Sequence, residues 1–331
     1  MSLFRKKTLF TASFALLCIP MLLLSACGAN AGSGSGTSTG GPNTSGSNSK
    51  GVTLTVGGKL DGESKILTEL YTLVLRDAGY TVNEKPAFGD NAIVFQGIKS
   101  GALDIYPEFT ATGLDALSKK SSLDDQTDYN TVKTGYKQQF NIDWLNYSPL
   151  NDTYAICMQK SVAQRMNITT ISDLAAKASQ LTFDLQSDGG YVFDYLKPKY
   201  NNLSLASFKG SHKVDYEIGL RELAAGQTQA AFCYSTDIGI VTNNFVALQD
   251  NNHAFPAYHP APIVRDSVLA KNPDIATVLN KLAPYLTTEV SLQLQKAVLD
   301  NTNQGMSNAQ AVTQAATTFL QKNNLCTHGC K

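Results

Sequence analysis

Four short segments of the sequence combine aromatic side chains with small polar residues, each at the end of a predicted strand or directly after one. They are YPEFTAT (106–112), NDTYAIC (151–157), FCYSTD (232–237) and FPAYHPAP (255–262). Open α/β sheets bind ligands at the carboxyl ends of their strands. One aromatic residue at such a place is more often a core or hinge residue, but four comparable places favour a binding site.

Aromatic faces are best suited to bind a cation that has no N–H group, above all a quaternary ammonium. Such a cation cannot be hydrogen-bonded, and its methyl groups are only weakly hydrated. An aromatic face offers apolar contact and a negative quadrupole, worth roughly 0.5–2 kcal/mol per face. Three or four faces would supply much of the ~8 kcal/mol that a micromolar affinity requires, and closure of two lobes around the ligand would exclude water.

The sequence contains fewer signals for catalysis than for ligand binding. The sequence has no GxGxxG segment, no Walker glycine loop and no HExxH segment. Its four histidines, at positions 212, 253, 259 and 328, are scattered, so we interpret each as a surface or satisfied polar residue. The sequence therefore predicts no catalytic residue, no cofactor and no metal site.

The apolar pattern predicts strands that alternate with helices in two successive units. Short turns between such elements are typical of parallel sheets. Ser172 is the expected cap of one helix, and three helices are expected between 272 and 325. The other predicted elements are strands at 52–56, 81–85, 103–106, 181–185 and 228–234 and helices at 63–79, 91–101, 171–178 and 216–226.

The N-terminus has the features of a bacterial lipoprotein signal. Three basic residues at 5–7 precede an apolar run that stops at LSAC, which ends with Cys27. This segment resembles a lipobox, in which the cysteine is diacylated; an ordinary signal peptide is the alternative. Residues 28–50 are almost all Gly, Ser, Thr and Asn, a composition typical of a flexible tether. We therefore expect a signal at 1–26, and an extracytoplasmic domain anchored to the cell membrane through Cys27 and this tether.

Net charge indicates which partners to expect, and the cysteine content indicates possible disulfides. Without the signal the chain has three more acidic than basic residues and no basic stripe, so no nucleic-acid partner is expected. Four cysteines besides Cys27 predict up to two disulfides outside the cytosol. A Cys326–Cys330 bond would close a short loop in the C-terminal tail, 326–331; metal binding with His328 is the weaker alternative.

The ordered set of motifs resembles the substrate-binding proteins of ABC importers for glycine betaine, choline and related osmoprotectants. GGKLDGES looks like the family's GSKNFTEQ, DIYPEFTATGL like DIYPEYTGTGL, NDTYAI like NNTYAL, CYSTDIGI like YSTDGRI, and FPAYHPAPIVR like FPPYNAAPVVR. The resemblance runs from about Val52 to Leu325. It implies a two-lobed α/β fold of the type II periplasmic-binding-protein class, with parallel-rich sheets flanked by helices and two hinge crossings. Lobe I would comprise 51–150 plus 259–325, and lobe II 151–258.

In this family a cage of four aromatic residues, one from each motif, encloses the trimethylammonium head. Carried over by motif, the cage is Phe109, Tyr154, Tyr234 and Tyr258. The resemblance also places Thr112 and Lys59 at the ligand's polar tail, and Asp152 would add a negative charge beside the cation. A solvated turn residue at Lys59 and a turn cap at Asp152 are the alternatives.

Two departures from the family pattern bear on the ligand. Phe109 replaces the usual tyrosine and lacks its hydroxyl. Gln186, in QSDGG, stands where members that bind glycine betaine often carry an arginine whose fork grips the carboxylate. An amide cannot supply that contact, so choline is favoured, with glycine betaine and carnitine still open. Tyr191 is a further candidate for a wall of the aromatic cage; the alternative is an ordinary packing role.

Cys157 lies three residues after Tyr154, and Cys233 directly precedes Tyr234. If their strands are neighbours, a Cys157–Cys233 disulfide would fix the spacing of two cage walls. Two buried free thiols are the alternative.

The leading hypothesis is a monomeric, lipid-anchored receptor that captures a quaternary ammonium and delivers it to an ABC permease driven by its ATPase. Such a receptor performs no chemistry. The alternatives are a receptor for another cation or a neutral solute, a secreted enzyme on the same fold, and a surface adhesin.

Overall fold

The computed structural model describes residues 50–187 and 189–330. The expected signal, the expected lipidation site Cys27 and the expected tether up to residue 49 lie outside the described residues. Within the described ranges, no helix is both long enough and apolar enough to cross a membrane.

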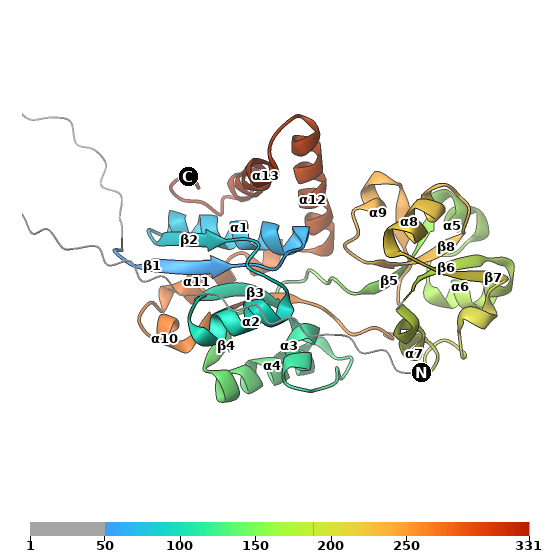
Figure 1. The fold of residues 1–331 in the computed structure, drawn as a ribbon, viewed down its shortest axis with the longest axis horizontal. Helices are drawn as coiled ribbons and strands as arrows, with labels where there is room; N and C mark the ends of the chain where they lie inside the picture. The colour runs from blue at the N-terminus through green and yellow to red at the C-terminus, as the bar shows by residue number, and fades with distance from the viewer. Residues whose placement is uncertain (1–49, 188, 331) are drawn as a thin grey trace, which may run out of the picture. The chain divides into compact units, whose positions relative to one another are not determined.

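The first sheet has five strands in the spatial order β2-β1-β3-β10-β4 (Figure 1). Strand β1 pairs in parallel with both β2 and β3, whereas β10 runs antiparallel to both β3 and β4. The bounds are β1 Thr53–Gly57, β2 Thr81–Lys85, β3 Ile105–Phe109, β4 Ile142–Trp144 and β10 Pro260–Arg265.

The second sheet has five strands in the order β7-β6-β8-β5-β9. Strand β6 is parallel to β7 and β8, and β5 is antiparallel to β8 and β9. The bounds are β5 Tyr154–Gln159, β6 Thr182–Gln186, β7 Gly210–Val214, β8 Ala230–Tyr234 and β9 Phe245–Ala247. Both sheets are therefore mixed rather than parallel-rich, because β5 and β10, the strands that follow each chain crossing, run against their neighbours.

Helices cover both faces of the first sheet and form two cores. One core joins α1, α11, α12 and α13 to β1 and β2, and the other packs α2, α3 and α4 around the buried Trp144. We call this sheet with its helices the first lobe, and the second sheet with its helices the second lobe. The helices of the first lobe are α1 Gly62–Asp77, α2 Asn91–Ser100, α3 Thr110–Ala116, α4 Asp125–Phe140, α10 Asp266–Leu269, α11 Asp274–Asn280, α12 Thr288–Asn303 and α13 Asn308–Lys322, with a 3₁₀ turn η4 at Ala283–Tyr285.

The second lobe likewise has a core on each face of its sheet. Its helices are α5 Lys160–Met166, α6 Ile171–Lys177, α7 Val192–Leu196, α8 Tyr216–Ala224 and α9 Gly239–Thr242, with 3₁₀ turns η1 Ala178–Gln180, η2 Gly189–Tyr191 and η3 Leu205–Ser207.

The expected cap of α6 was wrong by two residues. Thr170, not Ser172, precedes the helix, and its hydroxyl accepts a hydrogen bond from the N–H of Asp173 at 3.1 Å. The Asp173 carboxylate accepts from the N–H of Thr170 at 3.0 Å in return. This reciprocal capping box satisfies two backbone donors at once, which Ser172 would not do from inside the helix.

Strand β3 extends three residues beyond the predicted LDIY segment. It reaches Phe109, and all five of its residues are buried. Pro107 is tolerated inside it because pairing with β1 is recorded only at Ile105, and because its partner on β10 is another proline, Pro262. The strand end therefore delivers Phe109 to the point where the chain passes between the lobes.

Candidate ligand-binding site

The two chain crossings lie side by side and position the predicted motifs. The N–H of Asp152 donates to the carbonyl of Tyr258 at 3.1 Å, and the N–H of Tyr258 donates to the Asn151 side chain at 2.8 Å. Thr153 adds a hydroxyl bond to the carbonyl of Pro256 at 2.6 Å. Two motifs about 100 residues apart in sequence thus form one hydrogen-bonded hinge.

His259 anchors this hinge to the first lobe. Its side chain is buried, with Nδ1 2.7 Å from the carbonyl oxygen of Leu150 and Nε2 3.0 Å from the Asp125 carboxylate. The N–H of His259 also donates to the Thr110 hydroxyl at 3.0 Å. His259 is therefore a satisfied polar residue, as the sequence indicated, and it supports the site without facing it.

Tyr154 is the centre of an aromatic cluster that contains two further predicted cage residues. Its ring centroid lies 5.6 Å from that of Tyr258 and 6.0 Å from that of Tyr234. The hydroxyl oxygens of Tyr154 and Tyr258 are 2.9 Å apart, and Tyr154 faces Tyr234 across the β5–β8 pair. Burial raises the pKa of Tyr258 to about 12, so this phenol is neutral at physiological pH.

Tyr191 and Tyr195 belong to the same cluster; the sequence indicated Tyr191 only as a candidate wall, and Tyr195 was not predicted. Their ring centroids lie 5.6 and 6.0 Å from that of Tyr154. Both side chains remain accessible, with 41% and 37% of their surface exposed. Their four-residue spacing across η2 and α7, which places them on one helical face, was the signal that could have found them.

Phe109 does not share this cluster in the described structure; it carries a resident cation. The Lys59 ammonium lies 4.9 Å from the centroid of the Phe109 ring and 2.7 Å from a carboxylate oxygen of Glu108. Glu108 also accepts bonds from the Tyr106 hydroxyl at 2.7 Å and from the N–H of Phe109 at 2.8 Å. Lys59 is thus a buried, ion-paired residue rather than a solvated turn residue. Its contact with a ligand tail stays a prediction, as does the place of Phe109 in the cage.

Carboxylates surround the hinge. Asp152 is half-buried and accepts a hydrogen bond from the Thr236 hydroxyl. Burial raises its pKa and the Thr236 bond lowers it, with smaller contributions from Asp61 and Lys59. Burial also raises the pKa of the neighbouring Glu63 well above its usual range, with Asp152 adding to the effect. Of these two carboxyl groups, Asp152 is the one that acts on a ring of the cluster, Tyr234, and its ionised form would favour a cationic ligand.

A cavity of about 360 Å³ opens beside Tyr154 and Tyr258, large enough for a small organic cation. Asp115, on α3, supplies it with a carboxylate whose pKa is raised by burial and by Glu108. Asp115 was not among the residues predicted from the sequence; it directly follows the segment DIYPEFTATGL that carries the family resemblance. The cavity is lined by Ala111, Leu114, Asp115, Lys119, Lys120, Ser121, Leu123, Tyr154, Tyr195, Pro256 and Tyr258.

Gln186 and Thr112 lie near these elements without an identified ligand contact. Gln186 ends β6, and its side-chain carbonyl oxygen is buried with no hydrogen-bond partner among the described residues. Thr112 is half-buried in α3. Their ligand-binding roles stay predictions.

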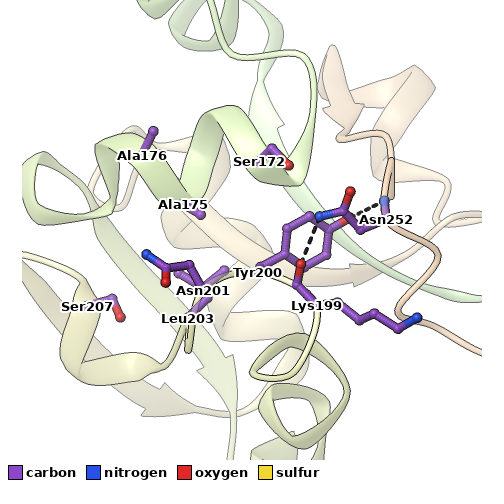
Figure 2. A pocket seen from close by; sticks show the side chains of 9 residues that line it. All are labelled: Ser172, Ala175, Ala176, Lys199, Tyr200, Asn201, Leu203, Ser207 and Asn252. Atoms are coloured by element: carbon purple, nitrogen blue, oxygen red, sulfur yellow. Dashed lines mark hydrogen bonds between the residues drawn. The ribbon is translucent and has the colours of Figure 1, made fainter.

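A second cavity, of about 350 Å³, lies on the second lobe between α6 and the segment around Tyr200 (Figure 2). Asn252 closes one side, donating its amide to the carbonyl of Lys199 at 2.8 Å, while its N–H donates to the Tyr200 hydroxyl at 2.9 Å. Only one aromatic residue and no carboxylate line this cavity, so it suits a quaternary ammonium less well.

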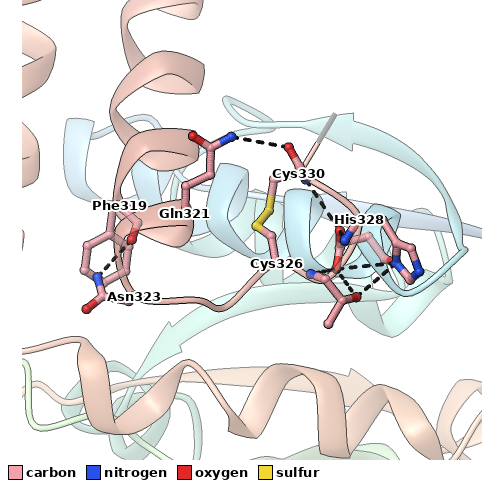
Figure 3. Close-up of a disulfide and its surroundings, with 9 residues drawn as sticks. Phe319, Gln321, Asn323, Cys326, His328 and Cys330 are labelled. Atoms are coloured by element: carbon pink, nitrogen blue, oxygen red, sulfur yellow. Dashed lines mark hydrogen bonds and ion pairs between the residues drawn. A yellow bond between two sulfur atoms is a disulfide. The ribbon is translucent and has the colours of Figure 1, made fainter.

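The structure pairs the four described cysteines in two disulfides. Cys157 on β5 is bonded to Cys233 on β8, with 5.8 Å between their Cα atoms, and so ties together the strands that carry Tyr154 and Tyr234. Cys326 is bonded to Cys330 in the tail (Figure 3). There the Asp77 carboxylate accepts bonds from the N–H groups of Thr327 and His328 at 2.6 and 2.7 Å, which fastens the loop to the end of α1.

Comparison with known proteins identifies the family. Residues 52–322 match the family model OpuAC, described as the substrate-binding domain of the ABC-type glycine betaine transport system. The chain is 30% identical over 263 residues to the glycine betaine-binding protein YehZ of Escherichia coli K12, covering 73% of this chain and 84% of that protein. It is 27% identical to the carnitine transport binding protein OpuCC of Listeria monocytogenes 10403S, covering 82% of this chain and 87% of that protein.

A third relative is longer. The chain is 26% identical to the ergothioneine transport permease/ergothioneine binding protein EgtU of Helicobacter pylori G27 over 74% of its own length, but it spans only 44% of that protein. Among solved structures, apo YehZ from E. coli superposes with a TM-score of 0.71 at 24% identity, covering 84% of this chain and all of that one. This likeness confirms the two-lobed α/β fold expected of periplasmic binding proteins. The chain belongs to the family of substrate-binding domains of ABC-type glycine betaine transport systems, and it is a transport binding protein rather than an enzyme.

Proposed function

We propose that this protein captures a quaternary ammonium compound, choline in the first place, at the Tyr154 cluster and delivers it to the permease of an ABC importer. The observation that carries the proposal is the convergence of Tyr234 and Tyr258 on Tyr154, with ring centroids 6.0 and 5.6 Å away, beside acidic groups at the hinge. Each ring face contributes roughly 0.5–2 kcal/mol to the binding of a methylated cation.

Relatives support the class of ligand. Two similar proteins are named for glycine betaine and for carnitine, both of which carry a trimethylammonium group. A site that binds this group through aromatic faces would accept any member of the class whose tail fits the remaining space. The tail therefore decides which member is preferred.

Choline is favoured because its tail is neutral. Gln186 offers an amide where a carboxylate-binding arginine would stand, and the charge of Lys59 is already engaged by Glu108 at 2.7 Å. Asp115 and Asp152 would in addition repel a carboxylate tail. A hydroxyl tail avoids these costs.

One observation favours a second candidate, a ligand with a carboxylate tail such as glycine betaine or carnitine. Lys119 and Lys120 line the same cavity as Tyr154 and Tyr258, and both are exposed. Their ammonium groups could pair with a carboxylate at the cavity mouth.

Isothermal titration of the purified mature chain with choline, glycine betaine and carnitine separates these candidates. We expect one site per chain, with choline tightest. Tighter binding of glycine betaine or carnitine, with loss of that preference in a Lys119→Met/Lys120→Met variant, would favour the second candidate. Millimolar or weaker binding of all three would refute the quaternary ammonium proposal.

The membrane anchor is part of the same proposal. Diacylated Cys27 would hold a monomeric binding domain outside the cytoplasm near its permease, with the segment up to residue 50 as tether. Detergent phase partitioning of the protein expressed in a bacterial host tests this: the native chain should enter the detergent phase, and a Cys27→Ala variant should not. Equal partitioning of the two would contradict the anchor.

A further inference from the structure

We infer that the second lobe carries a divalent transition-metal site formed by Asp184, His212 and Glu222. One potential ligand atom from each residue lies within 4.8 Å of the other two. The site is separate from the aromatic cluster, and neither the sequence motifs nor the family relationship assigns it. We identify the ion by its chemistry, as one that takes imidazole and carboxylate ligands together, and use Zn²⁺ as the probe.

Three different elements bring the ligands together. Asp184 stands in the middle of β6, and His212 is its partner in register on the parallel edge strand β7. Glu222 comes from α8, one turn after Gly219. A Cβ atom at Gly219 would lie 3.5 Å from the Cβ of Asp184, which shows how closely this part of the helix crosses the strand.

Asp184 provides the independent sign of a missing partner. Its side chain is fully buried, Oδ1 lies 3.1 Å from Nδ1 of His212, and Oδ2 is buried with no hydrogen-bond partner among the described residues. A buried carboxylate oxygen without a partner is costly in a folded protein, and each instance needs an explanation. A metal ion between Asp184, His212 and Glu222 would give this oxygen a partner.

The set of ligand atoms suits such an ion, because two carboxyl groups and one imidazole are ligands that Zn²⁺ takes in proteins.

The geometry requires little rearrangement. In a tetrahedral zinc site with bonds of about 2.1 Å, ligand atoms lie ~3.4 Å apart. The distance of 3.1 Å between Oδ1 of Asp184 and Nδ1 of His212 is already close to this value. The His212 side chain is 63% exposed, so it can turn, and Glu222 is only half-buried. A water molecule from solvent could complete the coordination.

Zinc titration of the full mature chain tests the inference. The protein is prepared without a polyhistidine tag, in a non-chelating buffer without reductant so that both disulfides stay intact, and Zn²⁺ is added in competition with a chromogenic indicator. We expect one Zn²⁺ per chain. His212→Ala and Glu222→Gln should each weaken binding by about tenfold or more, since ligand and supporting-group losses typically cost 10–100-fold.

A matched control uses another exposed histidine. His253 has a φ of 51°, a conformation that asparagine tolerates, so His253→Asn should fold normally and keep the affinity within about twofold. Zinc should also raise the thermal midpoint of the wild type and of His253→Asn, but not that of His212→Ala. This second readout does not depend on the indicator.

Two results would overturn the proposal. One is the absence of saturable Zn²⁺ binding by the wild type. The other is binding that His212→Ala and Glu222→Gln leave unchanged, including binding that is lost instead when His328 is replaced. In either case Asp184 and His212 would form only a structural contact, with Glu222 beside it.

Discussion

The two lobes differ sharply in the predicted ligand-binding residues that they carry. The second lobe presents half-exposed rings, with Tyr154 and Tyr234 on neighbouring strands that a disulfide ties together. The first lobe carries the buried Phe109 beside a buried ion pair, with the Lys59 and Glu108 side chains only 8% and 2% exposed. The second-lobe group is thus aromatic and accessible, whereas the first-lobe group is charged and internally satisfied.

This difference indicates that the two groups have different roles, ligand binding for the free rings and stability for the ion pair. Aromatic faces that remain free can bind a methylated cation, whereas the face of Phe109 already has an ammonium 4.9 Å away. The buried Lys59–Glu108 ion pair would then fix the shape and charge around Phe109 and stabilise the first lobe. The predictions below separate these two roles.

The largest expected effect is on stability. Replacing Glu108 by Gln leaves Lys59 as a buried charge without its counter-ion, so the free energy of unfolding should fall by ~3–5 kcal/mol. Urea denaturation of the ligand-free protein measures this. The matched control is Asp300→Asn, which removes the exposed Lys296–Asp300 pair and should cost less than about 1 kcal/mol. Equal losses for the two variants would contradict the structural role of the first-lobe pair.

The next effect is on affinity. Tyr154→Ala removes the ring at the centre of the cluster and should weaken choline binding at least about tenfold, or 1.4 kcal/mol. Tyr154→Phe keeps the face and loses only the hydroxyl contact with Tyr258, so its affinity should stay within about threefold. Calorimetric titration checks both variants after their melting curves show that they fold. Unchanged affinity in Tyr154→Ala would remove this residue from the cage.

A smaller effect is expected on selectivity. Gln186→Arg should raise the ratio of glycine betaine affinity to choline affinity about fivefold, because a guanidinium can pair with the carboxylate. Gln186→Met, which adds no charge, serves as the control and should leave the ratio unchanged. A ratio that moves equally in both variants would show that Gln186 lies away from the ligand's tail.

The smallest effect is a pH dependence that arises at the hinge. Burial raises the pKa of Asp152, so its carboxyl gains a proton at a higher pH than an exposed aspartate. Only the ionised form attracts a cation, so choline affinity should be roughly threefold higher at pH 8 than at pH 5. Titrations at both pH values with the wild type and Asp152→Asn check this. Persistence of the full dependence in Asp152→Asn would assign it to other carboxyl groups.

Strongly periodic segments made most of the fold predictable from the sequence. The strand at 81–85 and the three C-terminal helices appear where the apolar pattern placed them. The end of β3 was missed because proline within YPEF suggests a break, whereas the pairing of Pro107 with Pro262 makes its missing N–H harmless. The directions of β5 and β10 were not predicted either, because whether they run antiparallel to their neighbours depends on the path of the chain between the lobes.

The aromatic cluster was predictable from motifs in the sequence, whereas side-chain pairs between segments far apart in the sequence were not. Tyr154, Tyr234 and Tyr258 lie together as the family resemblance implied. The Lys59–Glu108 pair spans 49 residues of sequence, and in a sequence Glu108 is only one polar residue in a strand. Lysine in a glycine-rich turn has the same appearance whether it is solvated or buried, so only the packing of β1 beside β3 distinguishes the two.

The most direct test of the account compares choline with its uncharged carbon analogue, 3,3-dimethyl-1-butanol, by calorimetry on the wild-type protein. The two molecules share shape and hydroxyl, and they differ in the positive charge that aromatic and acidic groups recognise. If the cluster binds a quaternary cation, choline should bind at least about tenfold more tightly than 3,3-dimethyl-1-butanol. Equal affinities would show that the cluster around Tyr154 is only an apolar pocket, and would contradict the claim that it binds a quaternary cation.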